Sequence, residues 1–263
     1  TSVSRGLGDV YKRQLQLTLA YAEEQSRFDI EDVATAARED AGNFIINGKK
    51  SMVLNAESAD KVVVVTRTSG SQVDINGISL FLVDLDNEGI ERDNFPTVDG
   101  LRASEITFKD VKVSAENLIG EKDKGFSILQ EVVNDAILAL SAEAVGAMEV
   151  LYKDTVEYTQ QREQFDRPLS DFQVLQHRMV DMFMEYEQCK SLLLRATMET
   201  VQDPVSSQRT VHALKHLIGK SGIFVGESAV QTHGGMGVTE ELRIGHFFKS
   251  CLLYTSDAAD DVA

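Results

Sequence analysis

The sequence predicts an α+β protein, in which a small antiparallel β-sandwich or barrel domain precedes an up-and-down four-helix bundle. Short runs of β-branched residues, separated by glycine-containing turns, occupy the chain between residues 15 and 113. After Gly120 the apolar residues instead recur every three or four positions, which is the period of a helix. The chain has 263 residues, enough for two domains that each bury a core.

The periodicity predicts four segments along the chain. Residues 15–118 form the β-domain, and residues 119–250 form the helical domain. Residues 1–14 and 251–263 lack the pattern of the segments that they flank, and we interpret them as an artefactual leader and tail. Ordinary exposed termini are the alternative.

In the β-domain, the dipeptide Asn47-Gly48 lies between two short apolar runs. It predicts a β-hairpin, because both positions of the tightest hairpin turn need a positive φ that these residues tolerate. Further strands are expected over residues 61–68, 77–85 and 104–113, where β-branched residues gather.

The first two helices are predicted from apolar spacing and capping residues. The first begins at Phe126 and approaches forty residues in length. Ser170-x-x-Gln173 matches a capping box and predicts the start of the second helix. This helix is expected to stop at Asp203-Pro204, because proline cannot continue a helix that precedes it.

The last two helices are predicted from the same apolar spacing and from a capping residue. The third is expected to begin near Ser206. The fourth is expected to run from Thr239 through Phe248, with Thr239 as the cap and Glu240 and Glu241 in its first turn. Short links between four such helices predict an antiparallel bundle.

Composition excludes several classes of function. A net charge of −16 and a pI near 4.7 argue against a nucleic-acid partner, which needs clustered lysine and arginine. No apolar run approaches the roughly 20 residues that span a bilayer. Cys189 and Cys251 are too few for a disulfide framework, so we expect a reducing, cytoplasmic setting, with the mitochondrial matrix as the alternative.

A glycine-rich segment, Gln-Thr-His-Gly-Gly-Met-Gly, occupies residues 231–237. Its backbone amides are open to an anionic ligand, and we expect them to lie at a helix N-terminus, where a phosphate group binds well. The alternative interpretation is a helix C-cap followed by a tight turn.

A second segment, upstream, carries Arg162 near the expected end of the first long helix. Its guanidinium offers paired donors that match a diphosphate. The alternative is an arginine that only interacts favourably with the last carbonyls of its helix.

These segments together resemble a known family. Arg162-x-x-Phe165, Phe172-Gln173 and Gln231-x-x-Gly234-Gly235-x-Gly237 resemble the paired signatures of FAD-dependent acyl-CoA dehydrogenases. The resemblance covers residues 15–250 and implies that family's middle β-domain and C-terminal helical domain, without its N-terminal helical domain. It implies that the FAD diphosphate is held, from the neighbouring subunit, by Arg162, Gln231, Gly234 and Gly235. It places Phe172 and Gln173 near the adenine, and leaves Phe165 as either a core residue or a stack against the cofactor.

The resemblance implies α,β-dehydrogenation of an acyl-CoA thioester, with electrons passed to an electron-transfer flavoprotein or a similar acceptor. It also implies a homodimer, a tetramer or a hetero-oligomer. Two alternatives are a non-catalytic partner subunit of a heteromeric enzyme and an acyl-CoA oxidase or nitroalkane-type flavoenzyme on the same scaffold. The length and branching of the acyl chain are not determined by the sequence.

The sequence departs from the family where the flavin ring is expected. The segment 21–29 keeps Glu23 of the family's flavin loop, but Ala22 has no hydroxyl to offer the ring. Leu54 replaces a threonine and can contribute only its backbone, while Met52 can pack against the ring. These departures resemble small subunits of heteromeric pimeloyl-CoA-type dehydrogenases.

The catalytic base is missing from its expected positions. Most of the family carries this carboxylate beyond Lys249, at a position that is Ala258 here. Other members carry it on the first long helix, at a position that is Ala136. Asp135 is adjacent, but one residue turns a side chain by about 100° around a helix. We therefore expect a truncated form whose base has been lost.

Two motif matches are rejected. His212 and His216 have the spacing of metal ligands on a helix, but Ala213 replaces the glutamate of a zincin, so no metal site is predicted. Residues 219–221 read Gly-Lys-Ser, yet Leu214 occupies the position of the first glycine of a P-loop.

Overall fold

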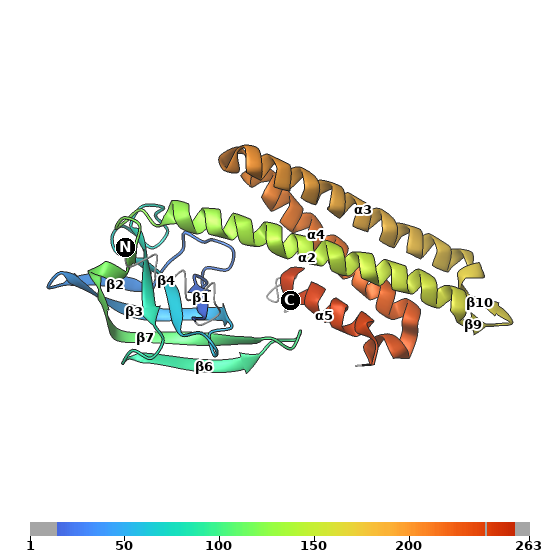
Figure 1. The fold of residues 1–263 in the computed structure, drawn as a ribbon, viewed down its shortest axis with the longest axis horizontal. Coiled ribbons are helices and arrows are strands. Elements are labelled where there is room, and N and C mark those ends of the chain that lie inside the picture. The colour runs from blue at the N-terminus through green and yellow to red at the C-terminus, as the bar shows by residue number, and fades with distance from the viewer. Residues whose placement is uncertain (1–14, 240, 256–263) are drawn as a thin grey trace. The chain divides into compact units, whose positions relative to one another are not determined.

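The structure is a computed structural model that describes residues 15–239 and 241–255. The chain divides into two compact units, residues 1–130 and residues 131–263. The first is rich in strands and the second is helical (Figure 1), which confirms the predicted α+β class. The expected leader and most of the expected tail lie outside the described residues.

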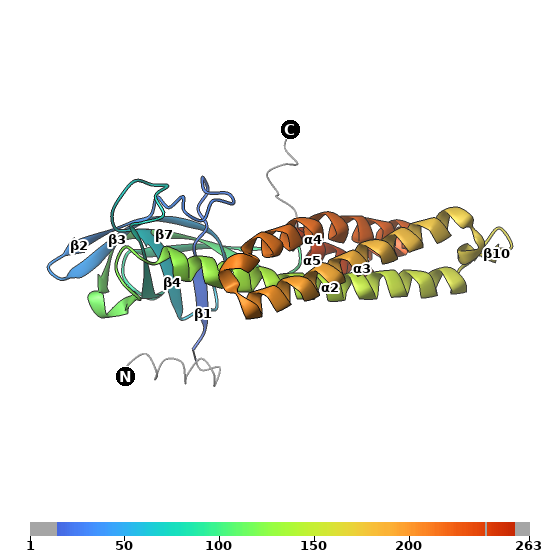
Figure 2. The same ribbon diagram turned by 90° about the horizontal axis from the view of Figure 1, so that it is seen from above.

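The β-unit contains one mostly antiparallel, eight-stranded sheet. Its order is β6-β7-β3-β2-β4-β5-β8, and β1 pairs in parallel with β4. The strands expected over residues 61–68, 77–85 and 104–113 are present as β4, β5 and β7. Figures 1 and 2 show the sheet from two directions. The strands are β1 (Leu17–Ala20), β2 (Ala36–Asp40), β3 (Asn43–Leu54), β4 (Lys61–Arg67), β5 (Ile78–Asp84), β6 (Ile90–Pro96), β7 (Arg102–Ser114) and β8 (Leu118–Ile119).

The core of the β-unit is built from alternating residues of these strands. Val62 and Val64 of β4 are fully buried, as period-two alternation requires of one face of a strand. Phe44 of β3 packs against Phe81 of β5 with 4.7 Å between ring centroids. Burial of each large apolar side chain contributes about 1.5–3 kcal/mol, which favours this register over any shifted one.

The hairpin predicted at Asn47-Gly48 is wrong, because β3 continues through it. The register between β3 and β7 shifts there, so the dipeptide forms a β-bulge. Gly48 has a φ of +149°, and a Cβ added to it would lie 2.6 Å from the Cα of Thr35. The turn between β2 and β3 lies instead at Ala41-Gly42, where both φ angles are positive.

The described residues of the helical unit form four α-helices, as predicted. The first begins within the β-unit's residues and spans 36 residues. A small hairpin and a 3-10 turn over Leu169–Asp171 connect it to the second helix, and single residues or short turns connect the others. The elements are α2 (Phe126–Gln161), β9 (Glu163–Gln164), β10 (Arg167–Pro168), α3 (Gln173–Gln202), α4 (Pro204–His233) and α5 (Arg243–Thr255).

Apolar faces of the four helices form the second core. Tyr152 of α2 contacts the rings of Phe183 and Tyr186 of α3, at centroid distances of 5.7 and 5.2 Å. Leu214 and Ile218 of α4 are buried one turn apart, at the i, i+4 spacing of one helix face. The helical period seen in the sequence therefore marks the buried face.

Two predicted helix starts differ from the structure. Ser170 does not cap α3, which begins at Gln173 and has Phe172 as its N-cap residue. The helix expected to begin near Ser206 is α4, which begins at Pro204. Asp203 caps it, because its carboxylate accepts hydrogen bonds from the N–H groups of Val205 and Ser206, at 3.0 and 3.3 Å. The Asp203-Pro204 pair therefore starts a helix as well as ending one, since proline fits the first helical position.

The last helix also differs from its prediction. Thr239 does not cap it, because its hydroxyl donates a hydrogen bond to the carbonyl of Met236, and α5 begins only at Arg243. The helix continues to Thr255, past the boundary expected at residue 250. Cys251 is buried in the helical core, so the first residues of the expected tail belong to the folded unit.

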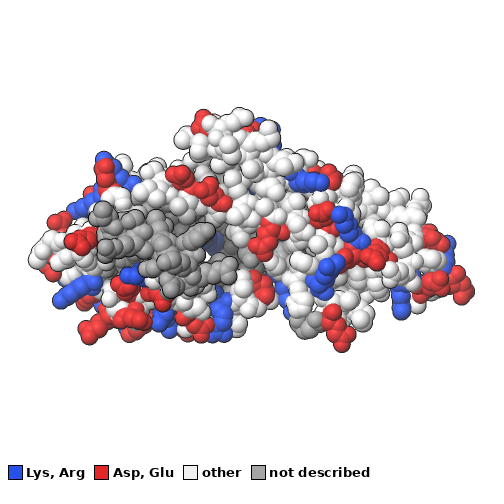
Figure 3. Space-filling model, viewed as in Figure 1, with Lys and Arg blue, Asp and Glu red and all other residues white. Residues whose placement is uncertain are grey.

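Charged side chains of both signs are interspersed over the face shown in Figure 3. The acidic surplus of the chain is therefore not gathered into one patch on that face. Over the described part of the chain, no helix combines the length and the apolar character that crossing a membrane requires.

Candidate functional site

The end of α2 meets the end of α4 through a pair of aromatic rings. The ring of Tyr158 stacks on that of His233, with 4.3 Å between centroids and 26° between planes. His233 is buried, and its Nδ1 forms a hydrogen bond of 2.8 Å with the carbonyl oxygen of Ala229. Arg162 lies one helical turn beyond Tyr158, and Gly234 directly follows His233. The stack thus brings the segment of Arg162 next to the glycine-rich segment.

The guanidinium of Arg162 is exposed, and it makes no hydrogen bond or ion pair with any residue that the structure describes. Its five N–H donors are available to an external anion. Arg243 provides a contrast, because its guanidinium donates two hydrogen bonds of 2.7 Å to the carboxylate of Asp154. Arg162 is therefore open to a ligand, whereas Arg243 is already paired.

The glycine-rich segment ends α4 and does not begin α5. Gly234 is the C-cap residue of α4, has a φ of 61° and donates its N–H to the carbonyl of Gln231. A 3-10 turn over Gly234–Val238 follows. The expected placement at a helix N-terminus is therefore wrong, and the C-cap interpretation is right.

Because the glycines lie at a helix C-terminus, the helix dipole cannot provide the attraction for an anion that was expected of a helix N-terminus. A helix C-terminus carries partial negative charge, so α4 does not itself draw a phosphate group. Gly234 and Gly235 contribute accessibility, since a Cβ added to either would meet no atom within 4 Å. Arg162 can supply positive charge here, and the open backbone allows a ligand to approach closely.

The β9–β10 hairpin lies between Arg162 and α3. Its two-residue loop, Phe165-Asp166, has φ angles of 57° and 64°, which define a type I′ turn. Phe165 is 85% exposed, which excludes the core role that the sequence left open. Its ring contacts the edge of Phe172, and the guanidinium of Arg167 lies 4.0 Å from the Phe172 ring centroid.

Asp166→Gly is expected to raise the free energy of unfolding by about 0.5 kcal/mol, because aspartate has to adopt a left-handed conformation that glycine adopts without strain. Urea unfolding of both proteins measures the difference. Asp171→Gly is the matched control, because its φ is not positive and glycine there only adds flexibility to the unfolded chain. A less stable Asp166→Gly protein would contradict the turn geometry.

A groove of about 930 Å³ lies between the first half of α3 and the last half of α4. Gln231 contributes an exposed side chain to it, and Gln173 is exposed at the start of α3. The lining is mixed, with residues such as Val174, Leu175, Arg178, Phe224 and Phe248. The groove can therefore accept a flat, partly apolar group.

The sequence-predicted residues of the helical unit lie at one end of the bundle, near the β9–β10 hairpin in Figure 1. They are Arg162, Phe165, Phe172, Gln173, Gln231, Gly234 and Gly235. Glu23 and Leu54, the other two expected cofactor residues, belong to the β-unit.

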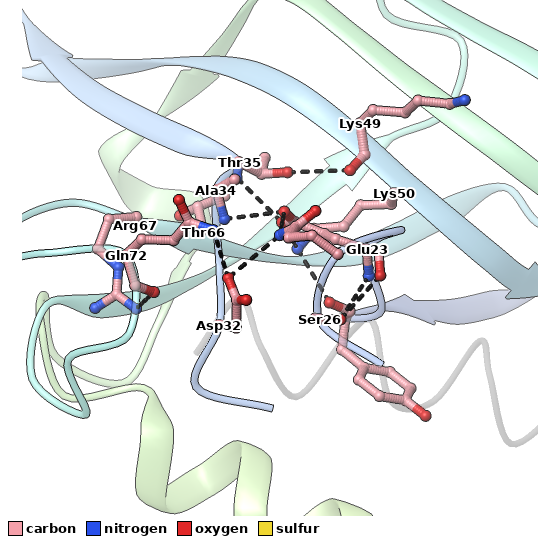
Figure 4. A network of polar contacts seen from close by, with 12 residues as sticks. Glu23, Ser26, Asp32, Ala34, Thr35, Lys49, Lys50, Thr66, Arg67 and Gln72 are labelled. Atoms are coloured by element: carbon pink, nitrogen blue, oxygen red, sulfur yellow. Dashed lines mark hydrogen bonds and ion pairs between the residues drawn. The ribbon is translucent and has the colours of Figure 1, made fainter. Parts of the chain in front are cut away.

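Glu23 is buried, and neighbouring protein groups use both of its carboxylate oxygens (Figure 4). They accept hydrogen bonds from Lys50 Nζ at 2.6 Å, from the N–H groups of Ala34 and Thr35 at 2.9 and 3.1 Å, and from the Gln25 amide at 2.8 Å. The expected direct contact of Glu23 with a cofactor does not fit this arrangement. The carboxylate of Glu23 stabilises the β-unit through these internal hydrogen bonds.

Burial alone raises the pKa of Glu23, but the charge of Lys50 and hydrogen bonds from Lys50, Gln25 and Thr35 outweigh it, so that the pKa lies below its ordinary value. Burial lowers the pKa of Lys50 to about 8, against the attraction of Glu23. Both side chains are therefore charged at neutral pH, and they form an ion pair with almost no solvent access.

This pair predicts a specific pH dependence of stability. Because folding lowers the pKa of Glu23, its contribution is complete above the unfolded-state value of 4.5 and disappears as the pH falls through the lower folded value. The difference in unfolding free energy between the natural chain and Glu23→Gln is expected to shrink as the pH falls below the unfolded-state value of 4.5. Denaturant unfolding at pH values on both sides of 4.5 measures it. A difference that does not change with pH would contradict the assignment.

The two segments expected near the flavin ring lie side by side in the β-unit. The N–H of Ser51 donates a hydrogen bond of 2.9 Å to the carbonyl of Ala22. Met52 occupies a second bulge of β3, with a φ of 51°. Met52 and Leu54 are 47% and 44% exposed, so each presents apolar surface to a ligand.

The position on α2 where some relatives carry the base is Ala136, which cannot act as one. Asp135 is exposed on α2 and makes no hydrogen bond or ion pair with a residue of the described ranges. Ala258 lies outside the described residues. No group of three or more histidine, cysteine, aspartate or glutamate side chains in the described ranges is placed to hold a metal ion.

Two features of the site were missed by reasoning from the sequence. Lys50 lies an even number of residues after the buried Phe44 and Ile46 on β3. Because alternate residues of a strand point to the same face, this spacing could have identified Lys50 as an inward-facing lysine. Tyr158 and His233 carry no sequence signal that would pair them, because they lie on different helices and contact each other only in the folded unit.

Comparison with known proteins supports one family. Residues 18–111 match the middle domain of acyl-CoA dehydrogenases, and residues 123–256 match their C-terminal domain. The chain is 29% identical to the 3-(aryl)acrylate reductase of Clostridium sporogenes over 238 residues, which are 88% of this chain and 62% of that protein. It is 30% identical to the short-chain specific acyl-CoA dehydrogenase of Megasphaera elsdenii over 217 residues, 81% of this chain and 56% of that protein.

Solved structures agree. The crystal structure of an acyl-CoA dehydrogenase from Geobacillus kaustophilus matches with a TM-score of 0.88 and 29% identity, over 97% of this chain and 68% of that one. The chain thus spans roughly three fifths to two thirds of the length of these relatives. Since matched domain models cover both of its units, the chain belongs to the acyl-CoA dehydrogenase family.

Proposed function

We propose that this chain forms the middle and C-terminal parts of an FAD-dependent acyl-CoA dehydrogenase, which removes hydrogen from Cα and Cβ of an acyl-CoA thioester. One observation carries the proposal. The Tyr158–His233 stack brings an unpaired, exposed arginine beside an open glycine backbone. Family membership supplies the reaction class, and this geometry supports a dinucleotide as the ligand.

The residues of the helical unit fit the diphosphate of FAD. Arg162 offers two parallel N–H donors, which is the geometry that phosphate oxygens accept. Gly234 and Gly235 leave space for the phosphates, and the exposed amide of Gln231 offers a further donor. A helix N-terminus is not needed, because the guanidinium supplies the charge.

The adenine is proposed to lie in the groove between α3 and α4. Phe172 directly precedes α3, whose first turns line the groove, and its half-buried ring packs against the guanidinium of Arg167, so it provides a rigid aromatic surface near the groove. Gln173 adds an exposed amide beside it, which can form hydrogen bonds with a base edge. The exposed Phe165 can fold against the same ligand.

In the β-unit, Met52 and Leu54 are proposed to cover the flavin ring and exclude water from it. Bound FAD supplies a two-electron acceptor for the hydride from Cβ. With Ala22 and Leu54 in place of hydroxyl-bearing residues, backbone groups have to provide the hydrogen bonds to the ring. A carboxylate is still needed to take the α-proton, because a thioester α-carbon is too weak an acid to lose it unaided.

The proposed partners follow from this arrangement. The substrate is an acyl-CoA, and the electrons pass to an electron-transfer flavoprotein or a similar acceptor. We propose a homo- or hetero-oligomer in which the helical unit of one copy holds the diphosphate of the FAD that serves another. In such an assembly FAD retention depends on protein concentration, because the site is complete only in the oligomer.

Arg162→Ala tests the proposal in the natural gene product that contains this chain. Loss of charge-assisted hydrogen bonds, each contributing about 1.5–3 kcal/mol, is expected to weaken FAD binding by at least roughly tenfold. Fluorescence titration with FAD measures the affinity. Arg195→Ala is the matched control, because Arg195 is an exposed arginine of α3 that pairs with Glu199 outside the site. A gene product that takes up no FAD, or equal affinities for all three proteins, would refute the proposal.

A second candidate function is a non-catalytic partner subunit. It is favoured by Ala22 and Leu54, which lack the hydroxyls of active relatives, and by the unpaired, exposed state of Asp135. Anaerobic mixing with acyl-CoA thioesters distinguishes the two. Bleaching of the flavin absorbance supports the dehydrogenase, whereas assembly of a hetero-complex without bleaching supports the partner subunit. Peroxide formation in air would indicate an oxidase.

A further inference from the structure

We propose that the buried Glu23–Lys50 ion pair is a positioning device for the flavin ring. It holds the loop of residues 21–26 against the bulge of β3 at Ser51 and Met52. The pair thereby sets the protein surface on which the flavin ring lies, although neither Glu23 nor Lys50 contacts the ring itself. The inference rests on the proposed function, because these two segments are the ones that we assign to the flavin.

Residues 50 and 51 are tied to the loop at three points. Lys50 Nζ donates hydrogen bonds to the Glu23 carboxylate at 2.6 Å and to the carbonyl of Tyr21 at 3.2 Å. The Ser51 N–H donates to the carbonyl of Ala22 at 2.9 Å. Two of these three bonds come from the lysine side chain (Figure 4), so its removal leaves one of the three, the backbone bond from Ser51 to Ala22.

Glu23 extends the connection to a third segment. Its oxygens accept the N–H groups of Ala34 and Thr35, the residues that lead into β2. The loop is also stabilised internally. The Ser26 hydroxyl accepts a hydrogen bond from the N–H of Glu23 and donates one to the carbonyl of Glu23, each at 3.0 Å. The carboxylate therefore joins the loop, the start of β2 and β3 at one buried point.

The bulge that this pair anchors is strained. Met52 has a φ of 51°, a left-handed conformation that costs a residue other than glycine about 1–2 kcal/mol. Such a conformation persists only where the surroundings hold it. Met52 follows the anchored Ser51 and Lys50 directly, and its side chain is nearly half exposed. The pair thus fixes the direction of an apolar side chain that faces the ligand.

An ion pair is a poor choice for stability alone. Two buried charges lose their hydration, and replacing such a pair by apolar residues is often neutral or stabilising. The best-attested role of a buried polar pair is to select one arrangement among several. Here the arrangement selected is the register of the loop on β3, which apolar packing by itself would leave less defined.

The test compares Lys50→Met, Glu23→Gln and the double variant in the natural gene product. Both single variants are expected to lower FAD affinity by about tenfold and to shift the absorption spectrum of the bound flavin. The double variant removes both charges, and it is expected to regain thermal stability while FAD affinity and spectrum remain altered. If the double variant also restores the natural affinity and spectrum, the pair is only structural and the inference is wrong.

Two control variants separate position from stability. Val83→Ala opens a cavity in the same core, on β5, and lowers stability without touching the loop. Lys49→Met removes the neighbouring, half-exposed lysine, which pairs with Glu105. Both controls are expected to keep the natural flavin spectrum. A spectrum that shifts equally in Val83→Ala would overturn the inference.

Hydrogen exchange on the protein without FAD gives a readout that is independent of the proposed function. Lys50→Met is expected to speed exchange at the Ala34 and Thr35 amides more than in β4 and β5, whereas Val83→Ala speeds exchange across the sheet. If the natural gene product binds no FAD but exchange changes in this local pattern, the proposed function fails and the loop anchor stands. A uniform change in Lys50→Met refutes the anchor itself.

Discussion

Lys50→Met is expected to lower the free energy of unfolding of the β-unit by about 3–5 kcal/mol, because it leaves the carboxylate of Glu23 buried without its counter-charge. Lys50 is completely buried, and Glu23 is only 5% exposed, so water cannot replace the lost partner. The carbonyl of Tyr21 loses a hydrogen bond in the same variant. Urea unfolding monitored by circular dichroism measures the change.

The double variant Glu23→Gln/Lys50→Met is the internal control for this effect. Removal of both charges is expected to recover much of the lost stability, because the large term is the unpaired charge and not the absence of the pair. Lys49→Met, which removes an exposed lysine, is expected to change the stability by less than about 1 kcal/mol. If Lys50→Met were as stable as Lys49→Met, the carboxylate would have to be hydrated, against its burial.

Arg67→Met is expected to destabilise the same unit by about 2–4 kcal/mol, because four backbone carbonyls each lose a hydrogen bond from the guanidinium. The guanidinium of Arg67, a residue only 8% exposed, donates to the carbonyls of Asp74 and Asn76 at 2.6 and 2.9 Å. It donates to those of Glu31 and Gln72 at 2.8 and 2.7 Å. One side chain therefore organises the loop between β4 and β5 and ties it to the segment before β2.

Limited proteolysis adds a local measurement to the stability change. Arg67→Met is expected to make residues 69–76 more susceptible to cleavage, since all of them are exposed and the guanidinium holds three of their carbonyls. Arg38→Met provides the matched control, because Arg38 is exposed on β2 and its loss is expected to alter neither stability nor cleavage. An unchanged cleavage pattern in Arg67→Met would show that the loop is held by other contacts.

Much of the fold follows from local patterns. The helical period from Phe126 onward predicts α2 closely, and the β-branched run over residues 61–68 predicts β4. The errors arose where one local signal permits two structures. Asn47-Gly48 tolerates the positive φ of either a turn or a bulge, and pairing of β3 with the distant β7 decides for the bulge. Asp203-Pro204 is compatible with both the end of one helix and the start of another.

The candidate site shows the same division. Residue types and their spacing indicate a diphosphate-binding arginine and a glycine-rich backbone, and the resemblance to one family follows from them. Whether Arg162 is free or already paired is not a property of its neighbours in the chain. Arg243 carries the same group and is engaged by Asp154 of another helix. Only the folded unit distinguishes the two arginines.

The sequence by itself determined the family, the α+β class and the kinds of residue available to a dinucleotide. Tertiary structure decided that the glycines end α4, that Tyr158 and His233 join the two halves of the site, and that Glu23 faces Lys50 and not a ligand. The physical reason is the sequence separation over which each kind of interaction acts. Backbone propensity and apolar period act over a few residues, whereas burial and hydrogen-bond partners depend on contacts between segments that are distant in the chain.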